Sequence, residues 1–308
     1  GMGGSGITAD VAAVAARDRG RVPVIAAKEP VLPAFVGPRT LVVGVSHSGN
    51  TAETVESLAA ARAAHAPCYV ITSGGALAEQ AAAWGCPVAT VPGDGQPRAN
   101  LAALVTALLT VLERAGAVDG VLADLDGLPR FLDDTMRKWR GDVPLRANPV
   151  KQLASDMGAL VPLFYAARGW MGIAALRGKS QVNENAERPA FWNELPELAH
   201  NELVAWTSPH DVSARAAVVL LRSADDETAD AARRFELLAD VVADRAAHVA
   251  TIHFEGPSAL ARFAAAAAFV DLLSVYLAFL GGVDPTPVGA IDAFKRGLSY
   301  ATERGEPR

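Results

Sequence analysis

Apolar and polar positions alternate in blocks along the first part of the chain. Short apolar runs, which suit buried strands, are separated by longer segments in which apolar residues recur at helical spacing. The expected strands are residues 22–26, 40–45, 68–72 and 88–91, and the expected helices are residues 52–65, 75–84 and 100–114. This alternation predicts a parallel sheet that helices cover on both faces.

The second part of the chain repeats the alternation after a polar stretch at residues 116–127, which we expect to be a domain boundary. A helix is expected at residues 129–139, and residues 180–185 fit the start of a strand or of a helix. Further expected strands are residues 160–165, 216–221 and 248–253, with helices at 190–197, 227–245 and 258–280. We therefore predict an α/β fold with two domains, residues 1–120 and 121–308.

Composition narrows the class of protein. The chain has 308 residues, of which 51% are hydrophobic and 20% charged, so it can bury the cores of two domains. A net charge of −6 and the lack of a Lys/Arg stripe argue against a nucleic-acid surface. Cys68 and Cys86 lack CxxC spacing and no secretory signal is visible, so we expect no disulfide framework and a cytoplasmic location.

One apolar segment, residues 263–283, has about the length that spans a bilayer. Asp271 lies in its middle, and a charge there is costly in lipid. We expect a core helix and no membrane association.

The segment with the clearest chemistry is residues 44–51, which follows an expected strand and precedes an expected helix. It contains three hydroxyl side chains, those of Ser46, Ser48 and Thr51, at the helix N-terminus. Free backbone N–H groups and the positive end of the helix dipole favour an anion there. The turn predicts a phosphate site, although hydroxyl residues also cap helices and form turns without binding anything.

Glycines and one arginine extend this edge of the sheet. Residues 1–7 have the composition of a strand-to-helix phosphate loop with Ser5 as its hydroxyl, yet no strand precedes them. Two explanations of the missing strand stay open: a gene start assigned too late, or an expression scar before Met2. Residues 72–75 form another, weaker turn of this kind.

Arg98, within residues 95–100, would bring a guanidinium to the same edge, or it is a surface side chain.

Acid–base candidates lie in the polar clusters at residues 181–187 and 189–202. Glu184 and His200 stand there among large apolar side chains, an environment that perturbs proton affinity. A carboxylate that moves a substrate proton and a histidine that handles a hydroxyl proton are the natural roles. Helix capping and surface charge are the alternative explanation of these clusters.

Farther on, prolines at 285 and 287 fix a turn at Thr286 before the helix that carries Lys295.

Taken together, these segments resemble the sugar isomerase (SIS) domain family, and within it the bifunctional phosphoglucose/phosphomannose isomerases. The resemblance runs nearly end to end and rests on the order of several motifs. They are GMGGSGI at 1–7, SHSGNT at 46–51, QPRA at 96–99, NENA at 183–186, HNE at 200–202 and DPTPV at 284–288. The resemblance implies two SIS-type αβα sandwich domains with parallel sheets, the N-terminal one without its first strand.

The resemblance also implies a role for each motif. The proton-transfer base falls on Glu184, and the histidine that assists ring opening falls on His200, which in this family reaches the site from the partner subunit. The intermediate-stabilising arginine falls on Arg98. The remaining implied residues are Ser46, Ser48 and Thr51 for phosphate, Gly4 and Ser5 for sugar, Thr286 for mannose-type activity, and Lys295.

The implied reaction interconverts glucose 6-phosphate and/or mannose 6-phosphate with fructose 6-phosphate through a cis-enediolate. It needs no cofactor and no metal, and the sequence has no HExxH-like ligand spacing. A homodimer with shared active sites is implied, its interface expected in residues 190–206 and 263–283.

Two alternatives remain at this point. The chain could bind a phosphosugar without catalysis, or isomerise a different sugar phosphate. We do not expect an aminosugar synthase, because it would need a glutaminase domain with a nucleophilic cysteine, which the sequence does not show. We do not expect a DNA-binding regulator either, because it would need a helix-turn-helix domain and no basic recognition helix is visible. Family members also carry an N-terminal helical extension that this sequence does not show, and Ala199 and Asn100 depart from the expected motif residues.

Overall fold

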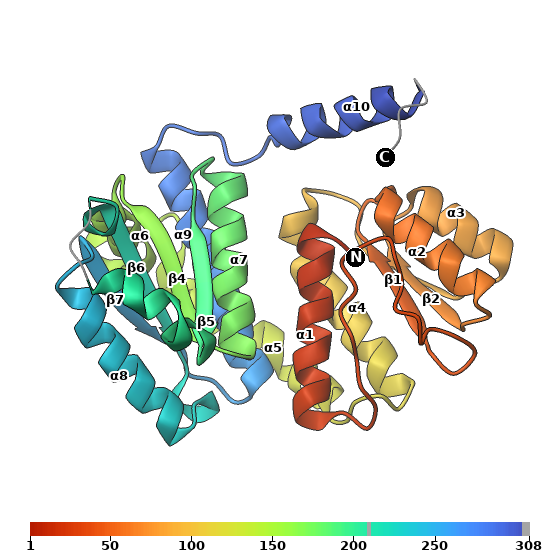
Figure 1. The fold of residues 1–308 in the computed structure, drawn as a ribbon, viewed down its shortest axis with the longest axis horizontal. Coiled ribbons are helices and arrows are strands. Elements are labelled where there is room, and N and C mark those ends of the chain that lie inside the picture. Colours follow the sequence, from red (N-terminus) through yellow and green to blue (C-terminus); the bar gives the residue numbers. More distant parts are fainter. Residues whose placement is uncertain (208–210, 304–308) are drawn as a thin grey trace.

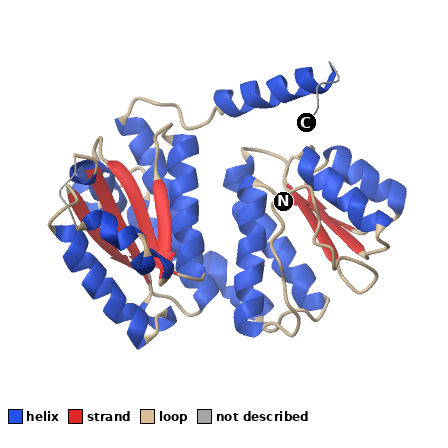
Figure 2. Cartoon of the chain, viewed as in Figure 1, coloured by secondary structure: helices blue, strands red, loops and turns tan. Residues whose placement is uncertain are grey.

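The computed structural model describes residues 1–207 and 211–303, which form two parallel sheets (Figures 1 and 2). The first sheet has the order β1-β2-β3 and the second the order β5-β4-β6-β7. The strands are β1 (Val42–Ser46), β2 (Cys68–Thr72), β3 (Val88–Thr90), β4 (Val161–Ala167), β5 (Phe191–Leu195), β6 (Ala216–Arg222) and β7 (His248–His253). Every strand pair is parallel, which confirms the predicted α/β class.

Helices cover both faces of the first sheet because successive residues of its strands point to opposite sides. Val70 packs in a cluster with Leu58 and Leu77, whereas its neighbour Ile71 packs in a second cluster with Val11 and Leu104. The helices on the first face are α2 (Ala52–Ala63) and α3 (Gly75–Trp84), and those on the second are α1 (Gly3–Arg19) and α4 (Leu101–Arg114).

The second sheet is covered in the same way. Tyr165 and Val218 pack with Phe235 of α8 on one face, while Phe164 and Val219 face the large cluster on the other. The helices are α5 (Val121–Met136), α6 (Pro149–Met157), α7 (Trp170–Asn185), α8 (Ala229–Ala243), α9 (Ala259–Leu280) and α10 (Gly289–Glu303). Short 3-10 helices add η1 (Pro97–Asn100), η2 (Arg137–Trp139), η3 (Leu145–Ala147), η4 (Glu197–His200), η5 (Glu202–Trp206), η6 (Ser213–Arg215) and η7 (Ala224–Asp226).

The inner helices of the two halves share one core. Side chains of α1, α4, α7 and α9 belong to a single hydrophobic cluster, and the indole Nε1 of Trp170 donates to Asp18 across the junction at 2.8 Å. α1 and α7 therefore stand side by side between the two sheets (Figure 1). The domain boundary after residue 120 stays a prediction.

Two expected elements of regular structure are wrong. Residues 22–26 do not form a strand, and among the described residues β1 pairs with β2 alone. Residues 190–197 were expected to be a helix, but Phe191–Leu195 is β5, in parallel register with β4. Prolines at 189 and 196 confine this segment to strand length.

Two expected loops are helical. α5 begins at Val121, inside the expected boundary, because Val121 and Leu125 lie one turn apart and both face the core. The expected glycine loop at residues 1–7 becomes helix from Gly3, and Gly6 N–H donates to the Met2 carbonyl. Residues 180–185, which fitted either state, are the end of α7.

α9 is the one helix in the described part of the chain that is long and apolar enough to cross a membrane. Of its most apolar window 56% is buried inside the protein, where it packs with α7 in the shared core. Length and composition of this kind are weak support for a membrane span, because core helices share them.

Candidate active site

The turn after β1 holds its hydroxyl groups close together at the start of α2. Ser46 Oγ lies 2.9 Å from Thr51 Oγ1 and also accepts from the Gly49 N–H at 3.2 Å. Ser46 is buried, Thr51 is half-buried and Ser48 is exposed. The three predicted hydroxyls thus share one short turn at a helix N-terminus, which is suited to an oxyanion.

Close backbone approach explains the glycines of this edge. Gly49 has φ of 68°, and a Cβ at this position would lie 1.7 Å from the Gly74 carbonyl oxygen. Only glycine fits both the left-handed backbone and the contact. The β1 and β2 turns are therefore packed backbone to backbone.

The N-terminus of α1 contacts the same turn. Ser5 Oγ accepts a hydrogen bond from the His47 N–H at 3.2 Å, and the His47 ring is itself held by the Pro92 carbonyl at 2.9 Å. Gly4 faces η1, since a Cβ there would lie 3.5 Å from the Arg98 Cα. The structure thus places Gly4 and Ser5 between the hydroxyl turn and Arg98.

Arg98 is not a surface residue. It is 7% exposed, and its Nε donates to Asn185 Oδ1 at 2.6 Å. Its Nη2 donates to the carbonyls of Pro285 and Thr286 at 2.6 and 3.0 Å. A guanidinium held by acceptors from α7 and from the turn after α9 is fixed in orientation.

Glu184 forms an ion pair with this guanidinium. Glu184 Oε2 lies 3.6 Å from Arg98 Nη1, and the Glu184 side chain is 29% exposed against 8% for that of Arg98. The carboxylate is therefore reachable from solvent beside a rigid, sheltered cation. Such a pair can move a proton and stabilise the negative charge that forms.

A cavity of about 190 Å³ lies beside this pair. The N-terminus of α1 and one face of α7 line it, and Arg98, Arg177 and Lys28 supply three cations against the single carboxylate of Glu184. Of the predicted site residues, the cavity brings together Gly4, Arg98 and Glu184. The hydroxyl turn joins this group through Ser5, although its own residues do not line the cavity.

The other predicted residues lie outside the cavity. His200 is exposed at the end of η4, and Lys295 is exposed on α10. Thr286 contacts Arg98 through its backbone carbonyl, and its side chain is exposed.

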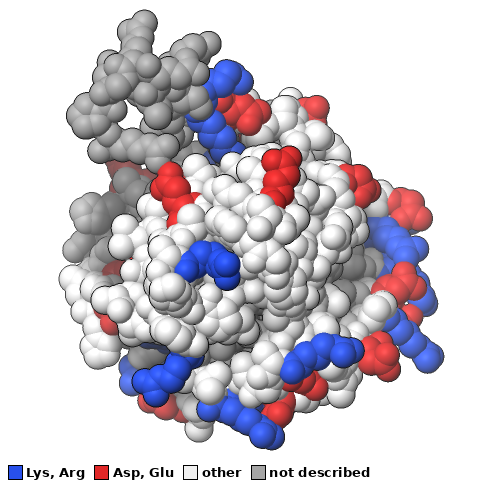
Figure 3. Space-filling model, turned by 90° about the vertical axis from the view of Figure 1, so that its right-hand side faces the viewer, with Lys and Arg blue, Asp and Glu red and all other residues white. Residues whose placement is uncertain are grey.

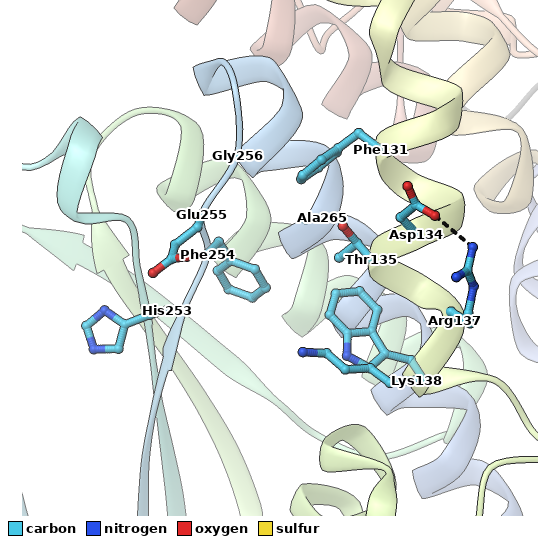
Figure 4. Close-up of a pocket in the computed structure, with 11 residues that line it drawn as sticks. Phe131, Asp134, Thr135, Arg137, Lys138, His253, Phe254, Glu255, Gly256 and Ala265 are labelled. Carbon is cyan, nitrogen blue, oxygen red and sulfur yellow. Dashed lines mark hydrogen bonds and ion pairs between the residues drawn. The ribbon is translucent and has the colours of Figure 1, made fainter.

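A second, larger cavity of about 690 Å³ lies elsewhere, between α5 and the loop after β7. Figure 4 shows Phe131 and Thr135 on the α5 side and Phe254 and His253 on the β7 side. It contains none of the predicted site residues, and its Asp134 is paired with Arg137 at 2.7 Å. The smaller cavity is the candidate site, because there a carboxylate and a fixed guanidinium meet.

Neither the surface charge nor the metal-ligating side chains of the described residues indicate a further site. On the face over the N-terminal half, acidic and basic side chains are interspersed (Figure 3). Within residues 1–207 and 211–303, no three His, Cys, Asp or Glu side chains gather as a metal site would require.

Several residues of the site were missed as functional candidates from the sequence. Asn185 lies within a predicted polar cluster, but its bond to Arg98 was not foreseen. Arg177 and Lys28 line the cavity from segments that carry no motif. The one available signal was Asp271, a charge within an apolar segment, which the structure pairs with Arg177 at 2.7 Å.

Known proteins resemble this chain along nearly its whole length. A family model described as the bacterial phospho-glucose isomerase C-terminal SIS domain matches residues 146–298. The chain is similar to a bifunctional phosphoglucose/phosphomannose isomerase of Caldicellulosiruptor bescii, at 34% identity over 97% of this chain and 88% of that protein. A protein of the same description from Aquifex aeolicus is 32% identical, with the same coverage.

Among solved structures, the C-terminal domain of glucosamine-fructose-6-phosphate aminotransferase from Francisella tularensis has a TM-score of 0.73. It covers 93% of this chain and 84% of its own, at 14% sequence identity. At that identity the likeness concerns the fold alone.

Proposed function

The chain belongs to the family of bifunctional phosphoglucose/phosphomannose isomerases, and we propose that it interconverts fructose 6-phosphate with glucose 6-phosphate, mannose 6-phosphate or both. The observation that carries this proposal is the contact between Glu184 and Arg98 beside a cavity. A carboxylate base paired with a fixed guanidinium is what an enediolate intermediate requires.

The hydroxyl turn supplies the anchor for the substrate in this proposal. Ser46, Ser48 and Thr51 bind the phosphate together with N–H groups at the start of α2. Binding energy gained at this distant group orients the reacting carbons, so the catalytic side chains act on a held substrate. Gly4 and Ser5 leave room for the sugar between phosphate and base.

The reaction then moves one proton between two carbons. Once the ring is open, Glu184 removes the proton from C2 of the aldose, or from C1 of the ketose, and returns it to the other carbon. The electron pair of the broken C–H bond forms the C1–C2 double bond while the carbonyl π pair moves to its oxygen, which gives the cis-enediolate. A proton also passes between the O1 and O2 oxygens before the new carbonyl forms. Arg98 stabilises its negative charge from the position that Asn185 and the 285–286 carbonyls fix.

Ring opening needs a group that handles a hydroxyl proton, and we assign it to His200 of a second subunit. Support comes from the exposure of His200 on η4 and from its absence among the residues that line its own cavity. The proposal therefore includes a homodimer with shared active sites, in the cytoplasm, without a cofactor. Thr286 is assigned to acceptance of the mannose epimer, and Lys295 to a supporting role from α10.

The test is proton NMR of fructose 6-phosphate incubated with the protein. We expect the signals of glucose 6-phosphate, mannose 6-phosphate or both to grow with time. A chain that binds fructose 6-phosphate, measured by calorimetry, but forms neither aldose is the non-catalytic binding protein of the same fold. Conversion of a different sugar phosphate alone would assign another specificity.

A further inference from the structure

Asp271 and Arg177 form an ion pair between α9 and α7, and Arg177 also lines the cavity. Arg177 Nε lies 2.7 Å from Asp271 Oδ1, and Arg177 Nη2 donates to Oδ2 at 2.7 Å. Gln181 adds a hydrogen bond to the same carboxylate at 2.9 Å. The Arg177 side chain is 1% exposed, so it would carry an uncompensated buried charge without this partner.

This pair also reaches Arg98. The Arg177 Nη2 that contacts Asp271 donates to the backbone carbonyl of Arg98 at 2.8 Å. The backbone of η1 at residue 98 is therefore held by a side chain of α7, which α9 fixes in turn. Gly4 of α1 also lies against that backbone, since a Cβ there would be 3.5 Å from the Arg98 Cα.

A second connection runs from α9 to the Arg98 side chain. Ser274 donates to the Asp271 carbonyl at 2.6 Å and accepts from Asn185 Nδ2 at 2.8 Å. Asn185 Oδ1 in turn accepts from Arg98 Nε at 2.6 Å. α9 thus holds Arg98 at two points, the backbone through Arg177 and the guanidinium through Asn185.

The alternative role of such a pair is to fasten α7 against α9. An apolar pair of similar volume would do that as well, and buried ion pairs replaced in this way often cost no stability. Only a hydrogen-bonding side chain at position 177 can hold the Arg98 carbonyl. The two roles therefore separate experimentally.

We propose that Asp271 and Arg177 are positioning residues for Arg98, and that they act on turnover without contributing to phosphate binding. This inference rests on the proposed isomerase function. It gives a role to the charge that interrupts the apolar helix α9, and it extends the active site beyond the residues of the sequence motifs.

The test replaces both charges together, in Arg177→Met/Asp271→Leu, so that neither is left unpaired. We expect kcat to fall roughly 10²-fold, with KM for fructose 6-phosphate within about threefold of wild type, because a catalytic group is misplaced while the phosphate site is intact. Arg262→Met/Asp226→Leu is the matched control. It removes another sheltered Arg–Asp pair that involves α9, remote from the cavity, and should keep kcat within about twofold.

A double-mutant cycle with Arg98→Met separates positioning from general loosening. If the pair acts through Arg98, removing the pair in the Arg98→Met background should lower kcat by less than about a further twofold. An equal loss in both backgrounds, or wild-type kcat in the paired variant, overturns the inference.

Folding is checked by thermal melting followed by circular dichroism. Asp271→Asn serves if the paired variant does not fold, because the amide keeps one acceptor for Arg177; we expect a loss of roughly tenfold in kcat. Wild-type kcat in that variant overturns the inference. If the wild-type chain shows no turnover, both this inference and the proposed function are wrong. If the wild type turns over and the variant is unaffected, only this inference is wrong.

Discussion

In the N-terminal half, the hydroxyl group of Ser46 contacts residues close in sequence, Thr51 and Gly49. Glu184 of the C-terminal half meets Arg98 of the N-terminal half, whose hydrogen-bond partners lie 87 and 187 positions away. A change in the turn should therefore stay local and alter binding. A change in the network around Arg98 should move a catalytic group and alter turnover.

The largest expected effect is that of Glu184→Gln in the C-terminal network. The amide keeps the shape of the carboxylate but cannot accept the substrate proton, so kcat should fall by about 10³-fold or more with KM little changed. Steady-state kinetics with fructose 6-phosphate measures both. Glu187→Gln, three positions on and exposed, is the control and should behave as wild type. Turnover of Glu184→Gln close to wild type would assign the base elsewhere.

Thr51→Val tests the other side of the comparison, the local turn. It removes one hydroxyl without changing the side-chain shape, and a lost hydrogen bond to a charged phosphate should raise KM by about tenfold while kcat stays within about twofold. Thr110→Val, at a half-buried position of α4, is the matched control. A fall in kcat with unchanged KM would mean that the turn does not bind the phosphate.

Thr286→Gln should lower turnover of the two epimeric aldose phosphates to different extents. Thr286 belongs to the turn whose carbonyls hold Arg98, and a larger side chain leaves less room for the second C2 configuration. We expect turnover of mannose 6-phosphate to fall about fivefold more than that of glucose 6-phosphate, measured by initial rates on each sugar. Equal losses on both would remove the specificity role and leave a role in holding Arg98.

The smallest expected effect concerns stability and pH. Burial raises the pKa of Asp226, but hydrogen bonds from Arg262 and Ser223 outweigh burial and lower it below its usual 3.8. A lowered pKa in the folded state contributes stability above the unfolded value, and this contribution is lost as pH falls through the folded pKa.

Asp226→Asn should therefore lower the free energy of unfolding by about 2 kcal/mol at pH 7, and by less at pH values below 3.8. Urea unfolding at both pH values measures this. Asp230→Asn removes an exposed pair with Arg234 and should cost under about 0.5 kcal/mol. A pH-independent difference for Asp226→Asn would exclude the titration of this carboxylate as its cause.

The difference between the halves also explains what the sequence could predict. The strand, turn and helix around Ser46 were predictable because hydroxyls, glycine and helix start lie within a few residues. Residues 190–197 were assigned the wrong element, because the pairing of β5 with β4 decides the conformation and is not visible locally. Residues 22–26 have a strand-like sequence as well, but they join neither sheet of the described chain, and their sequence alone does not show this.

Within the site, a family resemblance named Glu184 and Arg98, but nothing in their local sequence showed that they meet. Their contact depends on α7 packing beside α1 and η1. Arg177 had no local signal, and Asp271 gave only the information that a charge interrupts an apolar helix. Side-chain networks between distant helices need the packed fold before they can be recognised.

The most direct test of the central claim, proton transfer by Glu184, is the reaction of fructose 6-phosphate in D₂O followed by proton NMR. The account predicts that deuterium appears at C2 of the aldose formed, because the proton that Glu184 returns exchanges with solvent in the enediolate state. Aldose formed with protium kept at C2 in every molecule would mean that the migrating hydrogen never exchanges with solvent, as in direct hydride transfer, and would contradict the predicted exchange.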